Sequence, residues 1–458
     1  MSQPRPHIRE DERLPMLLGF QRVTENTAAL TRCIEHGRGI YVYDADGREY
    51  IEATASFYVA ALGYQNAELI DAIERQYREL PFFVSAHQRT PRVALELAEK
   101  LAAIAPVPRA HLLFGTSGSE AIDFLIKMLR FGAVARGEPQ RTTIIGRHGS
   151  YHGGTLASAS LTGGHHEEFG LPLAGFRHVA QPDFHGSRLP GESPQAFSDR
   201  LAAELATLID AEPAGSIAAF FAEPVCFADG FKVPPASYFP AVRAVLDAHG
   251  IELVADEVVT GFGRTGKLFG SQTLSLAPHH VTMAKGITSG YFPLSAIAIG
   301  EELYAALEAG SERLGVLAHA GTFAAHPVGA AAALKTIEII ERDGLVARAR
   351  AMGEHLARGL AALADHPLVG DIRTLGLGAG IDFLRRDADD RPRNDAADAD
   401  AVVAAVYRAL LERGVVARAA GRSLVLAPPL IVTASEIDEI CRRLALALDD
   451  VAQARRAG

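Results

Sequence analysis

The sequence predicts an α/β protein with a large domain built on a mainly parallel sheet and a smaller α+β domain. Two observations predict this fold class. From about residue 65, helix-like segments alternate with short apolar runs, and most of those runs have no polar interruption. An uninterrupted apolar strand is buried on both faces, as in parallel sheets covered by helices. The 458 residues allow two or three domains. We expect 1–60 to belong to the small domain, 61–326 to form the large domain and 327–458 to complete the small one.

The expected elements follow in chain order. After an arm of about 35 residues, Asp46-Gly47 can supply the positive φ of a tight hairpin turn between two short strands, 41–43 and 49–51. Helices are expected at 66–80, 92–103 and 329–340. The charged stretch 385–400 is most simply a solvated loop, with room for a helix after it. Buried strands are expected at 110–114, 142–145, 217–222, 251–255, 281–284 and 295–299.

Charge and composition exclude several classes of function. The chain has 45 Lys and Arg against 55 acidic residues, a net charge of −10, which argues against broad binding to nucleic acid or anionic membranes. No apolar signal segment opens the chain, and no apolar run is long enough to cross a bilayer. Three scattered cysteines form no CxxC pair, so we expect a cytoplasmic protein with reduced thiols. Adjacent histidines at 165–166 and 279–280 lack HExxH or CxxC partners, so no metal is expected.

Small residues mark the turn between the expected strand 110–114 and the helix after it. The turn Gly115-Thr116-Ser117-Gly118-Ser119 leaves backbone N–H groups free at a helix N-terminus, where the helix dipole and the serine hydroxyls favour a phosphate group. The segment is neither a Walker loop nor a GxGxxG motif. An ordinary capped turn would explain the same residues.

An aromatic residue stands in a glycine-rich loop after the expected strand 142–145. In Ser150-Tyr151-His152-Gly153-Gly154, the ring can lie flat on a planar cofactor because the glycines permit close approach. A purely structural loop is the alternative for this segment.

Two expected strands end in charged residues. Asp256 and Glu257 follow the run 251–255, at the strand end where open α/β sheets bind ligands. A helix cap or a structural salt bridge would also explain them. Lys285 follows the run 281–284, although lysine is among the residues least often buried. A lysine with a lowered pKa in a dry pocket is a nucleophile toward a carbonyl group, and a structural role remains the alternative.

These four features together describe one ligand, pyridoxal 5′-phosphate (PLP). The lysine binds the aldehyde of the cofactor, the carboxylate keeps the pyridine nitrogen protonated, and the turn holds the phosphate. No other common cofactor needs a phosphate-binding turn, a flat aromatic ring, a buried acid and a strand-end lysine at once.

Nearly the whole chain resembles the class III (ω-) aminotransferases, which have the PLP-dependent transferase fold type I, and within them the amine:pyruvate branch. The joint pattern ADEV…GFGRTG…AKG is the most specific part of this resemblance. Other matching segments are DADGREYIEA, ELPFF, GTSGSEAIDFLIK, GSYHGGT, FAEPV, MAKGITSGYFPL, GTFAAHPVGAAAAL and RAAGRSLVLAPPLIVT.

The resemblance implies roles for the residues that match the family motifs. Lys285 resembles the lysine that holds the cofactor covalently, Asp256 resembles the partner of the pyridine nitrogen, and Tyr151 resembles the ring that packs on the cofactor. Thr322 resembles the threonine that reaches the phosphate in the neighbouring subunit, which implies a homodimer with active sites at the subunit interface. The resemblance further implies that the cofactor contacts Ser117, Gly118, Ser119, His152, Glu223 and Val258.

The substrate pocket is expected to include Arg418, Phe57, Phe83 and Phe227. Arg418 resembles the mobile arginine that binds the carboxylate of a keto acid as a bidentate fork, and a surface arginine on a loop is the alternative. Three residues depart from the branch. Phe57 replaces a common tryptophan, Phe227 replaces a glycine and could narrow the pocket, and Arg422 replaces a frequent acid and could add positive potential for an acidic substrate.

The activity implied by this resemblance is transfer of an amino group from a small amine or ω-amino acid to a keto acid, with pyruvate favoured, by a ping-pong mechanism. Two alternatives remain at this stage. Other chemistry on the same cofactor, as in an aminomutase, a racemase or a decarboxylating aminotransferase, needs the same constellation. A catalytically idle descendant of the fold is disfavoured because Lys285, Asp256 and Tyr151 are all present.

Overall fold

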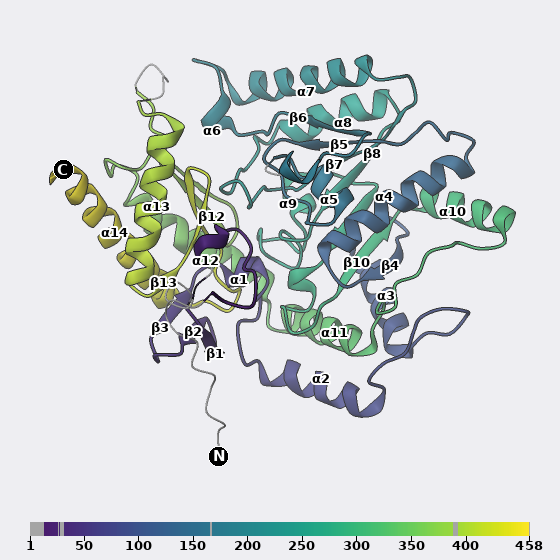
Figure 1. Ribbon diagram of the computed structural model, residues 1–458, viewed down its shortest axis with the longest axis horizontal. Helices are drawn as coiled ribbons and strands as arrows, with labels where there is room; N and C mark the ends of the chain where they lie inside the picture. Colours follow the sequence, from purple (N-terminus) through teal and green to yellow (C-terminus); the bar gives the residue numbers. More distant parts are fainter. Residues whose placement is uncertain (1–12, 26, 28–31, 165–166, 388–392, 458) are drawn as a thin grey trace.

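The centre of the molecule is a seven-stranded sheet, shown in the computed structural model of Figure 1, which describes residues 13–25, 27, 32–164, 167–387 and 393–457. Its order is β4-β10-β9-β8-β7-β5-β6. β10 runs antiparallel to both its neighbours, and the other strands run parallel. The predicted mainly parallel sheet is thus confirmed. Its strands are β4 (His111–Gly115), β5 (Thr143–Arg147), β6 (Phe176–Val179), β7 (Ile217–Ala222), β8 (Glu252–Asp256), β9 (His280–Met283) and β10 (Ser295–Ile299).

Successive side chains of the central strands enter two different cores. Ile144 and Phe221 belong to one cluster and their neighbours Ile145 and Phe220 to the other. Because helices cover both faces, each position needs an apolar side chain, and this is why the runs are uninterrupted. The first cluster includes α4 (Gly118–Ala135), α5 (Leu156–Leu161) and α10 (Glu301–Leu314). The second includes α3 (Arg92–Ile104), α7 (Pro194–Ala211), α8 (Tyr238–Ala248) and α11 (Pro327–Arg342).

Two four-stranded sheets accompany the central one. The first combines β1 (Ile34–Arg38), the predicted hairpin β2 (Tyr41–Asp44) and β3 (Glu49–Glu52), and β13 (Val415–Val416), which lies parallel to β3. The N-terminal strands therefore join the C-terminal part of the chain, as the assignment of 1–60 to the small domain requires; the domain boundaries themselves stay a prediction. The second sheet contains β11 (Asp371–Thr374), β12 (Ala379–Asp382), β15 (Ser423–Leu426) and β14 (Arg418–Ala420).

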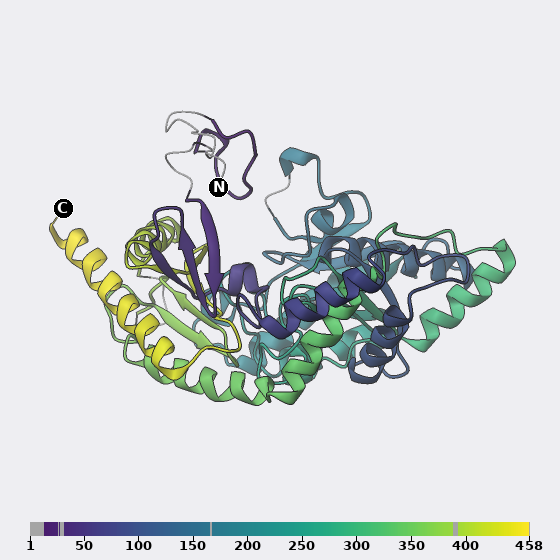
Figure 2. The ribbon, with the colours of Figure 1, turned by 90° about the horizontal axis from the view of Figure 1, so that it is seen from below.

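The remaining helices are consistent with their sequence signals. α2 (Ala67–Glu79) begins after Asn66, whose side chain accepts a hydrogen bond from the Leu69 N–H. α13 (Ala396–Glu412) begins inside the charged stretch 385–400, because the Asp395 side chain caps it by accepting from the Asp398 N–H, so the predicted loop is too long at its C-terminal end; residues 388–392 lie outside the described residues. α14 (Ala434–Ala457) lies at the opposite end of the molecule from α10 (Figures 1 and 2). The other helices are α1 (Ala55–Tyr58), α6 (Phe184–Ser187), α9 (Gly270–Leu274), α12 (Leu345–Ala361) and short 3-10 turns at Val23–Glu25, Glu167–Phe169 and Lys285–Ile287.

One strand of the central sheet was not predicted. β6 (Phe176–Val179) is one of the two edge strands, so it has only one neighbour, β5. Its central residues Arg177 and His178 are half-buried, and the four residues form no apolar run. An edge strand needs fewer apolar side chains than a central one, so it gives a weaker signal.

Among the described residues, no helix combines the length and the apolar character needed to cross a membrane.

Candidate active site

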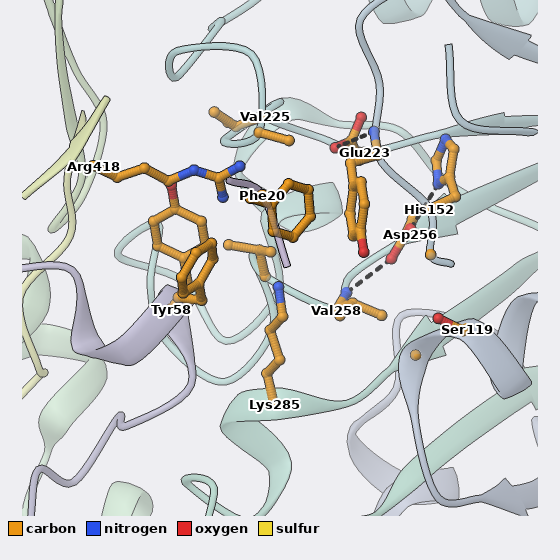
Figure 3. A pocket seen from close by; sticks show the side chains of 16 residues that line it. Phe20, Tyr58, Ser119, His152, Glu223, Val225, Asp256, Val258, Lys285 and Arg418 are labelled. Atoms are coloured by element: carbon orange, nitrogen blue, oxygen red, sulfur yellow. Dashed lines mark hydrogen bonds and ion pairs between the residues drawn. The ribbon is translucent and has the colours of Figure 1, made fainter. Parts of the chain in front are cut away.

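A cavity of about 260 Å³ lies at the carboxyl ends of β8 and β9 (Figure 3). This is the edge of the sheet where ligands of open α/β folds bind. Ten of the predicted site residues line the cavity together: Phe57, Gly118, Ser119, Tyr151, His152, Glu223, Asp256, Val258, Lys285 and Arg418.

Glycines and serines form the N-terminal end of α4. A Cβ atom on Gly118 would lie 3.2 Å from the methyl groups of Val258, and one on Gly153 would lie 2.5 Å from Ser119 Oγ. Gly153 therefore needs to be glycine, as its φ of 140° also requires, while a side chain at 118 would press on Val258; the two glycines leave the backbone open to a ligand. Ser119 Oγ accepts a hydrogen bond from the Gly154 N–H at 3.0 Å. Ser117 does not line the cavity, because its side chain caps α4 and accepts from the Glu120 N–H at 3.2 Å.

Asp256 ends β8, and both of its carboxylate oxygens are held. His152 Nδ1 lies 2.7 Å from Oδ2, while the Val258 N–H donates to Oδ1 at 3.1 Å. Thr282 Oγ1 also donates to Oδ1, at 3.3 Å. Asp256 is 4% exposed. A buried carboxylate fixed in this way presents a permanent negative charge to a cationic ring nitrogen in the cavity.

Lys285 opens a 3-10 turn directly after β9, with a positive φ of 49°. Its Nζ lies 5.5 Å from the centre of the Tyr58 ring. Desolvation by the surrounding protein lowers the pKa of this amine to about 8, and the positive charge of Arg418 acts in the same direction, while the carboxylate of Asp256 opposes it. A larger fraction of the amine is therefore neutral near pH 7 than for an ordinary lysine, which favours attack on a carbonyl group.

Glu223 supports the loop that carries Tyr151. Its Oε1 accepts from the Tyr151 N–H at 3.4 Å, and the buried Arg147 guanidinium donates to the Glu223 carbonyl at 2.7 Å. Burial raises the pKa of Glu223, whereas the charges of His152 and Arg147 lower it. Tyr151 itself is 36% exposed and presents its ring to the cavity.

The side of the cavity next to Arg418 is aromatic. The guanidinium of Arg418 lies 4.9 Å from the centre of the Phe57 ring and 5.7 Å from that of Tyr58. Phe20 also lines the cavity and packs on Phe57 and Tyr151, with ring centres 6.2 and 6.3 Å apart. The sequence reasoning missed Phe20, because it lies in an arm without periodicity, and Tyr58, although it directly follows Phe57.

Besides Ser117, three predicted residues lie outside this cavity and outside the larger one beside it. Phe227 is buried between Tyr58 and Phe231, with ring centres 4.9 and 4.7 Å apart, so it supports the wall from behind and the expectation that it narrows the pocket is wrong. Phe83 and Thr322 are exposed elsewhere on the surface of this chain.

Arg422 also does not face the pocket. Its Nε lies 3.1 Å from Asp382 Oδ1, and its terminal nitrogen pairs with Asp183. Two carboxylates thus neutralise the charge that was expected to attract an acidic substrate. Lys232 lies in the same buried network, 3.1 Å from Asp183.

The larger cavity, of about 1010 Å³, shares Phe20, Phe57, Tyr151, Ala228 and Arg418 with the first. It extends toward β1–β3, whose residues Ile34, Val42 and Glu52 line it. Within the described ranges, no three His, Cys, Asp or Glu side chains gather in a way that could hold a metal; His165 and His166 lie outside those ranges.

The residues present fit PLP. The glycine-lined end of α4 offers free backbone donors for a phosphate, Asp256 offers a fixed charge for the ring nitrogen, and Lys285 offers a weakly basic amine without a carboxylate partner among the described residues. His152 Nε2 is buried without a hydrogen-bond partner in the described part of the chain. The imidazole is therefore held through Nδ1, which contacts Asp256. Fold and site together define a PLP enzyme.

Comparison with known proteins identifies the family. The model for "Aminotransferase class-III" matches residues 23–448. The chain is 41% identical to the omega transaminase from Pseudomonas jessenii in complex with PMP, with a TM-score of 0.92 over 96% of each chain. It is 35% identical to the putrescine–pyruvate aminotransferase of Pseudomonas aeruginosa, over 98% of this chain and 96% of that one. It is 37% identical to the gamma aminobutyrate transaminase 1, mitochondrial, of Solanum lycopersicum, over 93% and 83%.

The chain therefore belongs to the class-III aminotransferase family, and it is a PLP-dependent aminotransferase of fold type I.

Proposed function

We propose that this aminotransferase moves an amino group from an amine or ω-amino acid to a keto acid, with pyruvate as the acceptor, in a ping-pong reaction. The observation that carries the proposal is the position of Arg418. Its guanidinium stacks on Phe57 and Tyr58 inside the cavity and has no carboxylate partner among the described residues. A half-buried guanidinium without a counter-charge is suited to a substrate carboxylate, which it can bind through two parallel hydrogen bonds.

The relative position of the two cationic groups supports a keto acid. Lys285 Nζ and the Arg418 guanidinium lie 5.5 and 5.7 Å from the centre of the same Tyr58 ring. A molecule that reacts next to Lys285 can therefore place a carboxylate at Arg418. Pyruvate is the acceptor of the Pseudomonas aeruginosa relative, a putrescine–pyruvate aminotransferase. A relative from Halomonas elongata, 37% identical, is a diaminobutyrate–2-oxoglutarate transaminase, so 2-oxoglutarate is the acceptor against which pyruvate is tested.

Three residues of the cavity have separate roles in the proposed reaction. PLP, when bound, supplies an electron sink for negative charge at the substrate carbon. Lys285 Nζ takes the proton from that carbon and returns a proton later, as general base and then general acid. Asp256, held by His152, stabilises positive charge at the ring nitrogen. The Tyr151 ring, which lines the cavity, would pack against the ring of the bound cofactor.

An acceptor screen with a matched pair of variants tests this proposal. In Arg418→Ala, the KM for pyruvate should rise about 10- to 100-fold, because a hydrogen bond to a charged group contributes roughly 1.5–3 kcal/mol. The kcat/KM for an uncharged amine should change much less. Arg408→Ala, an exposed arginine on α13, is the control. Equal KM values for the two variants would contradict the proposal, as would release of CO2 with the amine donor or faster turnover with 2-oxoglutarate.

We further propose that the protein is a homodimer with shared active sites. Thr322 is exposed and lies outside both cavities of its own chain. Next to it, Phe323 and Phe82 are 56% and 42% exposed, with ring centres 5.8 Å apart. Large aromatic side chains exposed side by side mark an interaction surface. A second copy that covers this surface would bring Thr322 to the phosphate side of its partner's cavity, the role that the family resemblance implies.

A further inference from the structure

Residues 55–58, which form α1, make one turn of left-handed helix at the edge of the active site. The φ angles of Ala55, Ser56, Phe57 and Tyr58 are 48°, 49°, 58° and 70°. The Tyr58 N–H donates to the Thr54 carbonyl at 2.7 Å, which closes the turn. None of the four residues is glycine, so each adopts a backbone conformation that its Cβ disfavours. Consecutive left-handed residues persist only where the surroundings hold them, and such strain gathers at functional sites.

This turn carries the aromatic floor of the substrate pocket. Phe57 and Tyr58 are the two rings on which the Arg418 guanidinium stacks, and Tyr58 also faces Lys285 Nζ (Figure 3). The Tyr58 hydroxyl donates to the carbonyl of Phe227 at 3.4 Å, which fixes only the far end of that ring. Phe227 packs against the Tyr58 ring and Phe20 against the Phe57 ring, but the backbone of the turn sets where both side chains start and so which way they enter the cavity.

A single carboxylate holds the turn from the side of β3. Glu52 Oε1 accepts from Thr54 Oγ1 at 2.6 Å and from the Thr54 N–H at 3.2 Å, and Oε2 accepts from the Ser56 N–H. Glu52 is 4% exposed and lines the larger cavity. Hydrogen bonds to an ionised carboxylate are about twice as strong as neutral ones. The Ser56 N–H is the first amide inside the left-handed turn, so this bond acts directly on the strained backbone.

We propose that Glu52 is a positioning residue of this aminotransferase: its carboxylate holds the left-handed turn that directs Phe57 and Tyr58 toward the substrate pocket. The effect of Glu52 on binding of the keto acid rests on the proposed function of Arg418, whereas its effect on the turn does not. An experiment can therefore contradict one of these claims and leave the other standing.

The charge state of Glu52 gives the proposal a pH signature. Burial raises the pKa of Glu52 to about 7, against the opposing effects of Thr54, the Arg264 guanidinium and the Tyr64 hydroxyl. Tyr407 of α13 faces the same carboxyl group. Below pH 7 the carboxyl becomes protonated and loses its charge-assisted hydrogen bonds, so the turn is held less firmly. Above pH 7 the carboxylate is charged and holds the turn.

A fluorescent probe in the turn tests the structural part without measuring activity. The chain has no tryptophan, so Phe57→Trp introduces a single reporter on the turn. Adding Glu52→Gln should lower the anisotropy of this tryptophan and increase its quenching by acrylamide. Asp44→Asn is the matched control, because Asp44 on β2 also accepts from one hydroxyl, Tyr50, and two backbone N–H groups. The proposal would be overturned if Asp44→Asn, added to Phe57→Trp, changed the anisotropy and the quenching as much as Glu52→Gln does.

Steady-state kinetics of Glu52→Gln and Asp44→Asn test whether Glu52 affects the binding of the keto acid. Glu52→Gln should raise the KM for pyruvate about tenfold, as expected for loss of a charged hydrogen bond, with a much smaller change in kcat. Asp44→Asn should leave the KM within about twofold of the wild type. If Arg418→Ala leaves the KM for pyruvate unchanged, the proposed function fails while the fluorescence result still decides the role of Glu52.

A glycine substitution keeps the proposal testable even if Glu52→Gln does not fold. Ser56→Gly removes the penalty for a left-handed backbone at the exposed position 56. The wild-type KM for pyruvate should rise as the pH falls from 8 to 6, and this rise should be smaller in Ser56→Gly because the turn no longer depends on the carboxylate. In the Glu52→Gln background, Ser56→Gly should restore most of the lost affinity. An unchanged pH profile in Ser56→Gly, or no restoration in the double variant, would overturn the proposal.

Discussion

His152 Nδ1 lies 2.7 Å from Asp256 Oδ2, and both side chains are buried at the carboxyl edge of the central sheet. The imidazole comes from the loop after β5 and the carboxylate from the end of β8, so the pair joins two segments about one hundred residues apart. With Val258 N–H on the other oxygen, the carboxylate cannot rotate. The negative charge therefore stays in place while a ligand enters and leaves.

Removing this imidazole should lower catalysis without removing the carboxylate. In His152→Phe the ring volume remains, but Asp256 loses its strongest partner, and kcat should fall about 10- to 100-fold, as expected for roughly 1–3 kcal/mol of an unsatisfied buried group. His178→Phe is the control, because His178 also bonds through a ring nitrogen, to the Leu161 carbonyl at 3.0 Å, and lines neither cavity. Steady-state kinetics that show equal kcat values for the two variants would contradict the role of His152.

Cofactor uptake by the apoenzyme should depend on the protonation of Lys285. Only the neutral amine attacks an aldehyde, and desolvation lowers the pKa of this amine to about 8. The second-order rate of PLP uptake should therefore rise with pH up to about 8 and then level off, whereas an ordinary lysine would continue to rise toward 10.5. Stopped-flow absorbance measures this profile. Lys285→Ala should leave no PLP on the protein after borohydride reduction and dialysis, and retention of the label would locate the covalent bond elsewhere.

Arg422 should matter for stability and not for substrate choice. In Arg422→Met, Asp382 and Asp183 lose a buried counter-charge, and the free energy of unfolding should fall by about 2–4 kcal/mol. Arg442→Met on α14, which breaks an exposed pair with Glu439, should change it by less than about 1 kcal/mol. Urea unfolding gives both values. A change in the KM for pyruvate specific to Arg422→Met would instead restore the idea that Arg422 acts on the pocket.

The proposed dimer depends on an exposed aromatic surface. Phe323→Asp places a charge beside Phe82 and should weaken self-association at least about tenfold, because buried aromatic residues at the centre of an interface contribute most of its binding energy. Leu446→Asp on α14, another large apolar residue that is 42% exposed, is the control at the far end of the molecule. Sedimentation velocity distinguishes the two. The proposal fails if the wild type sediments as a monomer at micromolar concentration or if both variants dissociate alike.

The central sheet and the cofactor residues could be predicted because their signals are local. A strand buried on both faces must be apolar throughout, so Asp256 and Lys285 stand out at the ends of their runs. Parallel strands place such ends at one edge of the sheet, and this brings the two side chains to one cavity. The segments of the family motifs are contiguous in sequence and need no knowledge of packing.

The pocket wall could not be predicted from the same signals. Phe227 and Arg422 each stand in a motif that suggests a pocket residue, yet one side chain enters an aromatic core and the other a buried ionic network. Phe20 reaches the cavity from an arm with no pattern of its own. A residue type does not specify which way its side chain points when distant segments compete for it.

The sequence by itself determined the sheet, the cofactor and the reaction class, because these follow from apolar runs and from chemical groups at their ends. Only the tertiary structure decided which side chains line the cavity. That choice depends on contacts between distant segments and on the left-handed turn at 55–58, a backbone conformation that no local preference of Ala, Ser, Phe or Tyr favours and that the surrounding fold imposes.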